Sequence, residues 1–337
     1  MIRDAIGKLV EGRSLSEEEA RAVMGQVMAG EATPAQIAAW LVALRLKGET
    51  PEELLGMVRA MRERAVPVET AGDPIDTCGT GGDASGSYNI STASAIVAAA
   101  AGIKVAKHGN RSASSKCGSA DVLEALGVRI ALTPQQARRC LDEAGITFLF
   151  AQAYHPAMKH VAPVRTEIGV RTVFNFLGPL ANPAGVRRQV LGVALSDLAP
   201  KMASILNDLG AVHALVVHGE DGMDEVSLGG VTSVYEVRDG AVRPYAITPE
   251  ELGLPRAGRS DLAGGDRDEN AAIIRRLLDG ERGPKRDALL ANASAALLVG
   301  GKAKDWKEGV ALAAGVIDSG AAKRKLEEFV RCSRDDG

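Results

Sequence analysis

Hydrophobic and polar positions follow two patterns that meet near residue 70. Before that point, three Ser/Thr-x-x-Glu/Gln boxes mark helix starts, at Ser16 with Glu19, Thr33 with Gln36 and Thr50 with Glu53. In each box a hydroxyl accepts a free backbone N–H while the acid or amide reaches back to the cap. One apolar helix face is expected from Ala38, Leu41, Val42, Leu44 and Leu46. The first 70 residues are therefore predicted to be helical.

From residue 71 onward, short apolar runs alternate with helical runs. The pattern predicts strands at 75–78, 103–107, 148–150, 189–193 and 212–217. Such alternation indicates an α/β fold with a mostly parallel central sheet. The stretch 155–185 interrupts it with a helical pattern broken by prolines.

A glycine-rich loop follows the first predicted strand. It reads DTCGTGGD at 76–83 and leads through NIST at 89–92 into an alanine-rich helix over 90–101. Glycines allow close backbone approach, and the unpaired N–H groups of a helix start, beside the hydroxyls of Ser91 and Thr92, form a cradle for phosphate. A helix dipole contributes only about 0.3–1 kcal/mol at an exposed site, so a multiply charged ligand needs further contacts. Taken alone, the glycine run is equally typical of a plain turn.

A second unit of the same kind follows the next predicted strand. It contains KHGNR at 107–111, then SSK at 114–116 and GSAD at 118–121, where Ser119 opens a helix over 120–126. Two such units predict a ligand whose two phosphate groups are held at separate points. The GxGxxG and GxxxxGK[ST] signatures are absent, which excludes the usual dinucleotide and P-loop sites. Lys107 and Arg111 have a second interpretation as solvated surface charges.

Composition is that of a globular enzyme with more than one domain. The chain has 337 residues, of which 46% are hydrophobic, and a net charge of -3. This charge argues against a nucleic-acid-binding protein, which is usually basic. The four cysteines, Cys78, Cys117, Cys140 and Cys332, form no CxxC pair, so neither a zinc site nor a disulfide framework is expected. The compartment expected for such a chain is the reducing cytoplasm. Neither a signal peptide nor a membrane-spanning run is expected.

Six motifs together resemble the anthranilate phosphoribosyltransferase family. They are GTGGD, NIST, KHGNR, SSK with GSADVLEALGV, HPAMKHVAPVR and FNFLGPLANP, and the resemblance spans roughly residues 1–330. It implies transfer of the phosphoribosyl group of 5-phosphoribosyl 1-pyrophosphate (PRPP) to the amine of anthranilate, with release of pyrophosphate, in tryptophan biosynthesis.

The resemblance also assigns substrate-binding residues. Those implied for PRPP are Gly79, Gly82, Asp83, Ser87, Asn89, Ile90, Ser91, Thr92, Lys107, His108, Gly109, Asn110, Arg111, Ser112, Ala113, Ser114, Ser115 and Ser119. Those implied for anthranilate are Gly79, Asn110 and Arg165, with His108 and Gly178 nearby. An alternative for Arg165 is a surface ion pair with Glu167 or Glu143. No catalytic general base is identified, so catalysis is expected from positioning and leaving-group stabilisation.

Ser91, Asp224 and Glu225 are the metal ligands that the resemblance implies, for two Mg²⁺ ions per subunit. Two carboxylates and a hydroxyl suit magnesium, which retains waters and substrate phosphates. Without the resemblance, Asp224 and Glu225 would be interpreted as the tip of a hairpin between 212–217 and 231–237.

The expected organisation is a small helical domain of two pieces, 1–70 and 155–185, on a larger α/β domain of two pieces, 71–154 and 186–337. This is the nucleoside-phosphorylase-like arrangement, with the active site between the domains. The resemblance implies a homodimer through the first helices, and neither nucleic acid nor membrane is an expected partner. Two rival functions remain: a relative of the same fold that binds nucleic acid, against which Asn110, Arg165 and the charge argue, and a pyrimidine-nucleoside phosphorylase, against which the joint motifs argue.

Overall fold

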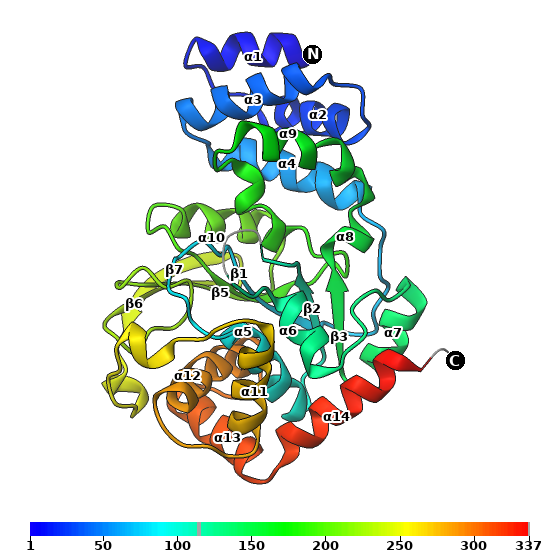
Figure 1. Cartoon of the computed structure of the whole chain (residues 1–337). Helices are drawn as coiled ribbons and strands as arrows, with labels where there is room; N and C mark the ends of the chain where they lie inside the picture. The colour runs from blue at the N-terminus through cyan, green and yellow to red at the C-terminus, as the bar shows by residue number, and fades with distance from the viewer. Residues whose placement is uncertain (113–115, 336–337) are drawn as a thin grey trace.

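Four helices at the N-terminus form a unit that stands on a larger α/β unit (Figure 1). The computed structural model describes residues 1–112 and 116–335. The first helices are α1 (Ile2–Val10), α2 (Glu17–Met28), α3 (Pro34–Lys47) and α4 (Pro51–Arg64). All three expected capping boxes are present, because each Ser or Thr hydroxyl accepts the N–H three residues on and the Glu or Gln side chain accepts the cap N–H.

One seven-stranded sheet forms the centre of the α/β unit, in the order β3-β2-β1-β4-β5-β6-β7. Its strands are β1 (Ile75–Gly79), β2 (Val105–Gly109), β3 (Ile146–Phe150), β4 (Arg188–Gly192), β5 (His213–Gly219), β6 (Thr232–Arg238) and β7 (Ala241–Ile247). The first five in this order pair in parallel, whereas β6 and β7 extend the sheet as antiparallel strands. The predicted parallel-rich sheet is confirmed, and β7 is an addition that the apolar pattern did not predict.

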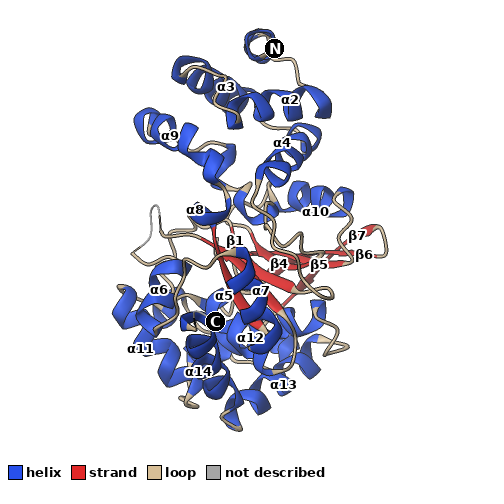
Figure 2. Cartoon of the chain, turned by 90° about the vertical axis from the view of Figure 1, so that its right-hand side faces the viewer, coloured by secondary structure: helices blue, strands red, loops and turns tan. Residues whose placement is uncertain are grey.

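Helices cover both faces of this sheet (Figure 2). Helix α10 (Ala199–Asp208) lies on the face toward the N-terminal unit. The opposite side carries α5 (Ile90–Ala100), α6 (Ser119–Leu126), α7 (Pro134–Glu143), α11 (Arg267–Leu278), α12 (Pro284–Val299), α13 (Trp306–Asp318) and α14 (Ala321–Arg334). Among the described helices, none combines the length and apolar character needed to cross a bilayer.

The segment after β3 returns to the N-terminal unit. It is a series of short turns, α8 (Ala151–Tyr154), η1 (Pro156–His160), α9 (Ala162–Ile168), η2 (Val173–Asn175) and η3 (Gly178–Leu180), of which the three η elements are 3₁₀ helices. The helical pattern broken by prolines that the sequence predicts over 155–185 is thus a series of short pieces, because proline cannot donate a backbone hydrogen bond. Apolar side chains of this segment, including Val161 and Phe174, pack into the same core as α1 to α4.

The two hydrophobic cores meet the sheet on opposite faces. On β4 and β5 and just after β4, Leu191, Val193 and Val216 belong to the core that includes the N-terminal helices, whereas Val190 and Leu215 belong to the core of the large helical layer. Successive side chains on a strand point to opposite faces, which accounts for this alternation. Helix α10 packs on β5 and β6 and also contacts α4, so the N-terminal unit joins this face of the central sheet through α10.

Two short 3₁₀ helices complete the chain between the sheet and α11. They are η4 (Glu250–Leu252) and η5 (Arg259–Leu262). Residues next to η5 pair with the glycine loop, as Ser87 forms a β-bridge with Ala263. This connector therefore lies beside the loop that follows β1.

Candidate active site

The predicted phosphate loops meet at the carboxyl ends of β1 and β2. These strands are parallel neighbours, and β4 lies on the other side of β1. In open parallel sheets, ligands bind at this edge, where adjacent loops diverge. The loop between β5 and β6 reaches the same place, since the side chain of Asp224 accepts a hydrogen bond from Gly81 N at 2.7 Å. Three segments distant in sequence therefore form one site.

Close backbone approach is required at Gly79 and at Gly192 on the neighbouring strand. A Cβ atom on Gly79 would lie 2.3 Å from Asp224 Oδ2, and one on Gly192 would lie 1.6 Å from the Asp224 carbonyl oxygen. Both contacts are far shorter than van der Waals distance, so the acidic loop packs here only against glycine. At Gly82, with φ of +75°, a side chain would also meet the guanidinium of Arg171.

The start of α5 is held by a carboxylate and a lysine. Ser91 N donates to Glu225 Oε1 at 3.1 Å, and Lys107 Nζ lies 3.3 Å from Ser91 Oγ and also donates to the Thr77 carbonyl. The sequence predicted a phosphate at this helix start. Glu225 accepts one of the N–H groups at this helix start, where the positive end of the helix favours negative charge. Thr92 Oγ1 is buried and has no hydrogen-bond partner among the described residues.

Three acidic side chains converge between the glycine loop and the β5–β6 loop. Burial and the neighbouring carboxylate of Asp83 raise the pKa of Asp224 to about 7. Burial and the charge of Asp224 raise the pKa of Glu225, although Lys107 opposes this shift. Such an excess of negative charge is stabilised by a cation.

The donor set fits a hard divalent cation whose coordination a substrate completes. Carboxylate and hydroxyl oxygens of Asp224, Glu225 and Ser91 are the ligands that magnesium prefers, and Asp83 Oδ2 is buried with no hydrogen-bond partner among the described residues. Within residues 1–112 and 116–335, no three His, Cys, Asp or Glu side chains form a ready-made metal cage. The residues therefore suit an ion that arrives with phosphate oxygens rather than a structural metal.

His108 joins the sheet to the segment above it. Its backbone N donates to Asp76 Oδ1 at 3.2 Å, and its Nδ1 lies 3.2 Å from the Gly178 carbonyl. Burial and the nearby His155, whose ring centre is 5.2 Å away, lower the pKa of His108 to about 3. Asn182 donates to Asp76 Oδ2 at 2.8 Å. The imidazole is therefore uncharged near neutral pH, and its Nδ1 lies in contact with the segment above the sheet.

The loop between β2 and α6 contributes polar groups of a different kind. Arg111 forms ion pairs with Asp121 at 2.8 Å and Glu124 at 2.6 Å, which accords with its interpretation as a surface charge. Ser119 Oγ donates to the Asn110 carbonyl at 3.3 Å. The proposed ligands Ala113, Ser114 and Ser115 lie outside the described residues.

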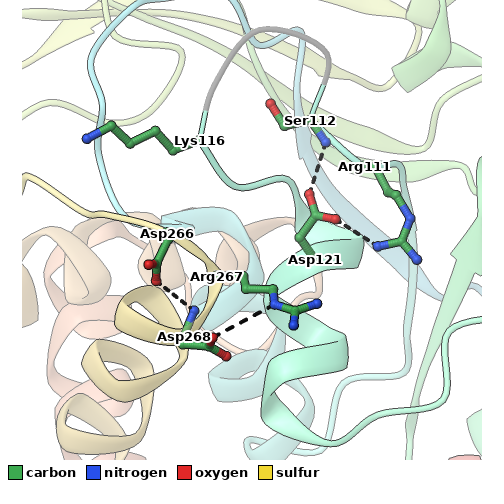
Figure 3. A pocket seen from close by; sticks show the side chains of 7 residues that line it. All are labelled: Arg111, Ser112, Lys116, Asp121, Asp266, Arg267 and Asp268. Atoms are coloured by element: carbon green, nitrogen blue, oxygen red, sulfur yellow. Dashed lines mark hydrogen bonds and ion pairs between the residues drawn. The ribbon is translucent and has the colours of Figure 1, made fainter.

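A cavity of about 460 Å³ lies behind this loop, on the side of α11 (Figure 3). Cations and carboxylates alternate along its wall and pair with one another, as Figure 3 shows for Arg111 with Asp121 and for Arg267 with Asp268. The cavity is lined by Arg111, Ser112, Lys116, Asp121, Asp266, Arg267 and Asp268. It does not include the acidic cluster.

Arg165 projects from α9 in the segment above the sheet. Its guanidinium lies over the ring of Phe174, 5.5 Å from the centroid, and burial lowers the pKa of Arg165. No ion pair of Arg165 is found in the described part of the chain, so the alternatives Glu167 and Glu143 are not its partners. Asn110, another of the three predicted anthranilate residues, is exposed just after β2.

Several further residues position the site although the sequence analysis gave them no role. Asn182 donates to Asp76, Arg171 Nη1 lies 3.4 Å from the Gly82 carbonyl, and Arg259 donates to the Asp83 carbonyl at 3.1 Å. Asp76 and Asn182 lie inside the motifs named above, so the sequence offered a signal for both residues. Arg171 and Arg259 belong to no recognisable pattern, because their partners are backbone carbonyls distant in the chain.

The chain matches two family models. Residues 71–323 match the glycosyl transferase family, a/b domain, and residues 3–65 match the glycosyl transferase family, helical bundle domain. It is 54% identical over 331 residues to the anthranilate phosphoribosyltransferase of Moorella thermoacetica, covering 98% of each chain.

Solved structures agree with this likeness. The crystal structure of anthranilate phosphoribosyltransferase from Thermus thermophilus has a TM-score of 0.93 and 52% identity, over 98% of this chain and 100% of that one. The Saccharomyces cerevisiae enzyme in complex with PRPP and Mg has a TM-score of 0.91 and 27% identity, over 98% and 97%. The chain belongs to the anthranilate phosphoribosyltransferase family.

Proposed function

We propose that this protein transfers the phosphoribosyl group of PRPP to the amine of anthranilate, giving N-(5-phosphoribosyl)anthranilate and pyrophosphate, in tryptophan biosynthesis. One observation carries the proposal most directly: the β5–β6 loop is hydrogen-bonded both to the glycine loop and to the start of α5. Gly81 N donates to Asp224, and Ser91 N donates to Glu225. A site that combines an acidic pair, a buried lysine and a helix start suits a metal-bound diphosphate.

PRPP binds along the glycine loop, the start of α5 and the β2–α6 loop. Lys107 is well placed for this role, because it is buried and its ammonium donates hydrogen bonds to the Thr77 carbonyl and to Ser91 Oγ. The other proposed contacts are Gly79, Gly82, Asp83, Ser87, Asn89, Ile90, Thr92, His108, Gly109, Asn110, Arg111, Ser112 and Ser119. Arg111 reaches the ligand after exchanging one of its surface carboxylate partners for phosphate.

Ser91, Asp224 and Glu225 hold the magnesium, and we propose two ions per subunit. When bound, magnesium neutralises the charge of the departing pyrophosphate. The protein's own contribution is to hold the carboxylates at fixed positions, since Gly81 N and Ser91 N each orient one of them.

Anthranilate binds against Arg165, Asn110 and Gly79, close to His108 and Gly178. The guanidinium of Arg165 receives the carboxylate in two parallel hydrogen bonds. A neutral aromatic amine is already a nucleophile, so attack on C1 requires alignment and not a strong base. The low pKa of His108 is consistent with this, because such an imidazole stays uncharged and accepts protons weakly.

Two pieces, 1–70 and 155–185, form the helical domain in this proposal, and 71–154 with 186–337 form the α/β domain. Closure of the first on the second excludes water and so limits hydrolysis of PRPP. The shared core of α1 to α4 with Val161 and Phe174 supports this division. Slow release of pyrophosphate in the absence of anthranilate is expected, and rapid release would contradict the closure.

A homodimer through the N-terminal helices is also proposed. Leu46 on α3 and Val10 at the end of α1 are exposed at 82% and 72%, which is unusual for large apolar side chains. Light scattering should give twice the 35.1 kDa chain mass, and Leu46→Glu should reduce it to the monomer. The compartment proposed is the cytoplasm, because the four cysteines lie far apart in the sequence and form no CxxC pair.

The function is tested by the fluorescence of anthranilate after mixing with purified protein, PRPP and magnesium. A loss of fluorescence that needs all four components supports the transferase. No loss of fluorescence under these conditions would refute it. Retention of the protein on a nucleic-acid column would then favour the nucleic-acid-binding relative.

A further inference from the structure

A connector over residues 257–264 joins the two loops that carry the acidic side chains. At one end, Ala257 N donates to the Leu228 carbonyl of the β5–β6 loop at 3.0 Å. At the other end, Gly264 N donates to the Gly86 carbonyl of the glycine loop at 2.8 Å. The connector is thus hydrogen-bonded through its backbone to both loops, and η5 lies between these two hydrogen bonds.

Arg259, the first residue of η5, reaches both loops with one side chain. Its Nη1 donates to the Asp221 carbonyl at 3.0 Å, and its Nη2 donates to the Asp83 carbonyl at 3.1 Å. The side chain is half-buried, and within the described residues it forms no ion pair. A planar guanidinium presents its donors in a fixed fork, so two carbonyls bound to it are held at a set separation.

Each of the two carbonyls belongs to a segment that carries acidic side chains of the candidate site. The Asp221 side chain closes its own loop by accepting Ser227 Oγ at 2.7 Å and Met223 N at 3.3 Å. The position of the Asp221 carbonyl therefore fixes the turn that presents Asp224 and Glu225. The Asp83 carbonyl belongs to the residue whose carboxylate faces Asp224.

We propose that Arg259 is a positioning residue, which sets the separation between Asp83 and the Asp224–Glu225 pair and thereby the affinity for a metal-bound diphosphate. This rests on the proposed function. The alternative is that Arg259 only ties the connector to the fold. Loss of a purely structural tie would lower stability without changing metal affinity in the folded protein, whereas loss of positioning would change metal affinity first.

The test is equilibrium binding of Mn²⁺, read by its electron paramagnetic resonance signal, in the presence of PRPP and without anthranilate. Arg259→Ala should weaken Mn²⁺ binding about tenfold, the scale expected for losing a hydrogen bond from a charged donor. In turnover assays the same variant should raise the KM for PRPP and the magnesium requirement, and leave the KM for anthranilate unchanged. Circular dichroism shows whether the variant is folded.

Arg256→Ala is the matched control. Arg256 lies just before the connector and is paired with Glu250 at 2.6 Å on the surface. Among the described residues it forms no hydrogen bond or ion pair with either loop, so its removal should leave Mn²⁺ affinity unchanged. Arg259→Lys keeps the positive charge but loses the planar pair of donors, so it should bind Mn²⁺ as weakly as Arg259→Ala. If the alanine variant does not fold, the Mn²⁺ affinity of Arg259→Lys tests the proposal instead.

Two results overturn the proposal: Mn²⁺ affinity of Arg259→Ala equal to that of Arg256→Ala, or wild-type affinity in Arg259→Lys. Both presuppose an active wild-type protein. If the wild-type protein consumes no anthranilate, the proposed function fails instead, so the two failures are distinguishable.

Discussion

The two sides of the candidate site are built differently. The PRPP side stands on the ends of parallel strands, where Lys107 and His108 are buried at 3% and 6% exposure and bonded to neighbouring backbone or carboxylate groups. The anthranilate side is formed partly by the series of short turns after β3, in which the half-buried Arg165 lies over the ring of Phe174. The PRPP side is a network of fixed polar groups, whereas the part of the anthranilate side above the sheet offers one cation beside an aromatic ring.

The difference corresponds to what each proposed substrate demands. A diphosphate with its metal carries several charges, and stabilising them requires donors that do not reorganise during reaction, which a sheet edge supplies. Anthranilate carries one carboxylate on a flat ring, for which one guanidinium and a hydrophobic surface are sufficient. Substitutions on the two sides should therefore have different kinetic signatures.

The largest effect is expected on the PRPP side, from Asp224→Asn combined with Glu225→Gln. These changes preserve shape but remove the charges that hold magnesium, so kcat should fall about 10²- to 10³-fold, as for loss of a leaving-group stabiliser. A magnesium titration of the initial rate checks this. A titration curve identical to that of the wild type would contradict the metal assignment.

On the anthranilate side, Arg165→Ala should raise the KM for anthranilate about 10- to 100-fold through loss of a charged hydrogen-bond pair. The KM for PRPP should stay near the wild-type value. Initial rates with each substrate varied in turn provide the measurement. Equal increases in both constants would show that the two sides are not separable in this way.

A smaller effect is expected where backbone approaches a carboxylate. In Gly79→Ala the new Cβ would lie 2.3 Å from Asp224 Oδ2 and must displace it, so the KM for PRPP should rise about tenfold, the scale of one lost charged hydrogen bond. Gly25→Ala, in helix α2 with no atom within 4 Å of the added Cβ, is the control. It should leave the kinetics unchanged and stabilise the fold by about 0.5–1 kcal/mol. Gly79→Ala with wild-type kinetics would disprove the close packing.

The smallest effect concerns stability at acid pH. The pKa of His108 is about 3 in the fold, below its ordinary value near 6.5, so between these values the unfolded chain binds a proton that the folded protein does not. Stability contributed by the neutral ring is complete above pH 6.5 and is lost as pH falls, by at most about 1.4 kcal/mol per unit. Asp76, whose pKa burial raises to about 6, opposes part of this loss.

His108→Phe keeps a ring but does not titrate. Urea unfolding at pH 7 and pH 5 should show that this variant loses less free energy of unfolding between the two pH values than the wild type does. Equal losses would mean that His108 binds its proton similarly in both states.

Much of the fold was predictable because its signals are local. The three capping boxes and the apolar runs that became β1 to β5 each depend on residues close in sequence. A fourth box of the same form, Thr133 with Gln136 at the start of α7, was equally visible. Strand β7 was not, because most of its side chains are exposed and it carries no apolar run.

The site was predictable only as far as its motifs reach. Ser91, Lys107 and His108 stand in motifs and lie in one place. Spacing alone gave no reason to place Glu225 beside Ser91, because 134 positions separate them, and only the family resemblance grouped the two. Arg259 was invisible for the same reason, since its bonds are to carbonyls, which every residue possesses. Tertiary contacts to backbone leave no trace in residue type.

The most direct measurement of the contrast between the two sides is isothermal titration of each substrate alone. If the PRPP side is preformed on the sheet, PRPP with magnesium binds the free protein with measurable heat, and omission of magnesium weakens it. Anthranilate alone, which depends on the turns above, binds much more weakly. PRPP binding that appears only after anthranilate is added would contradict the account.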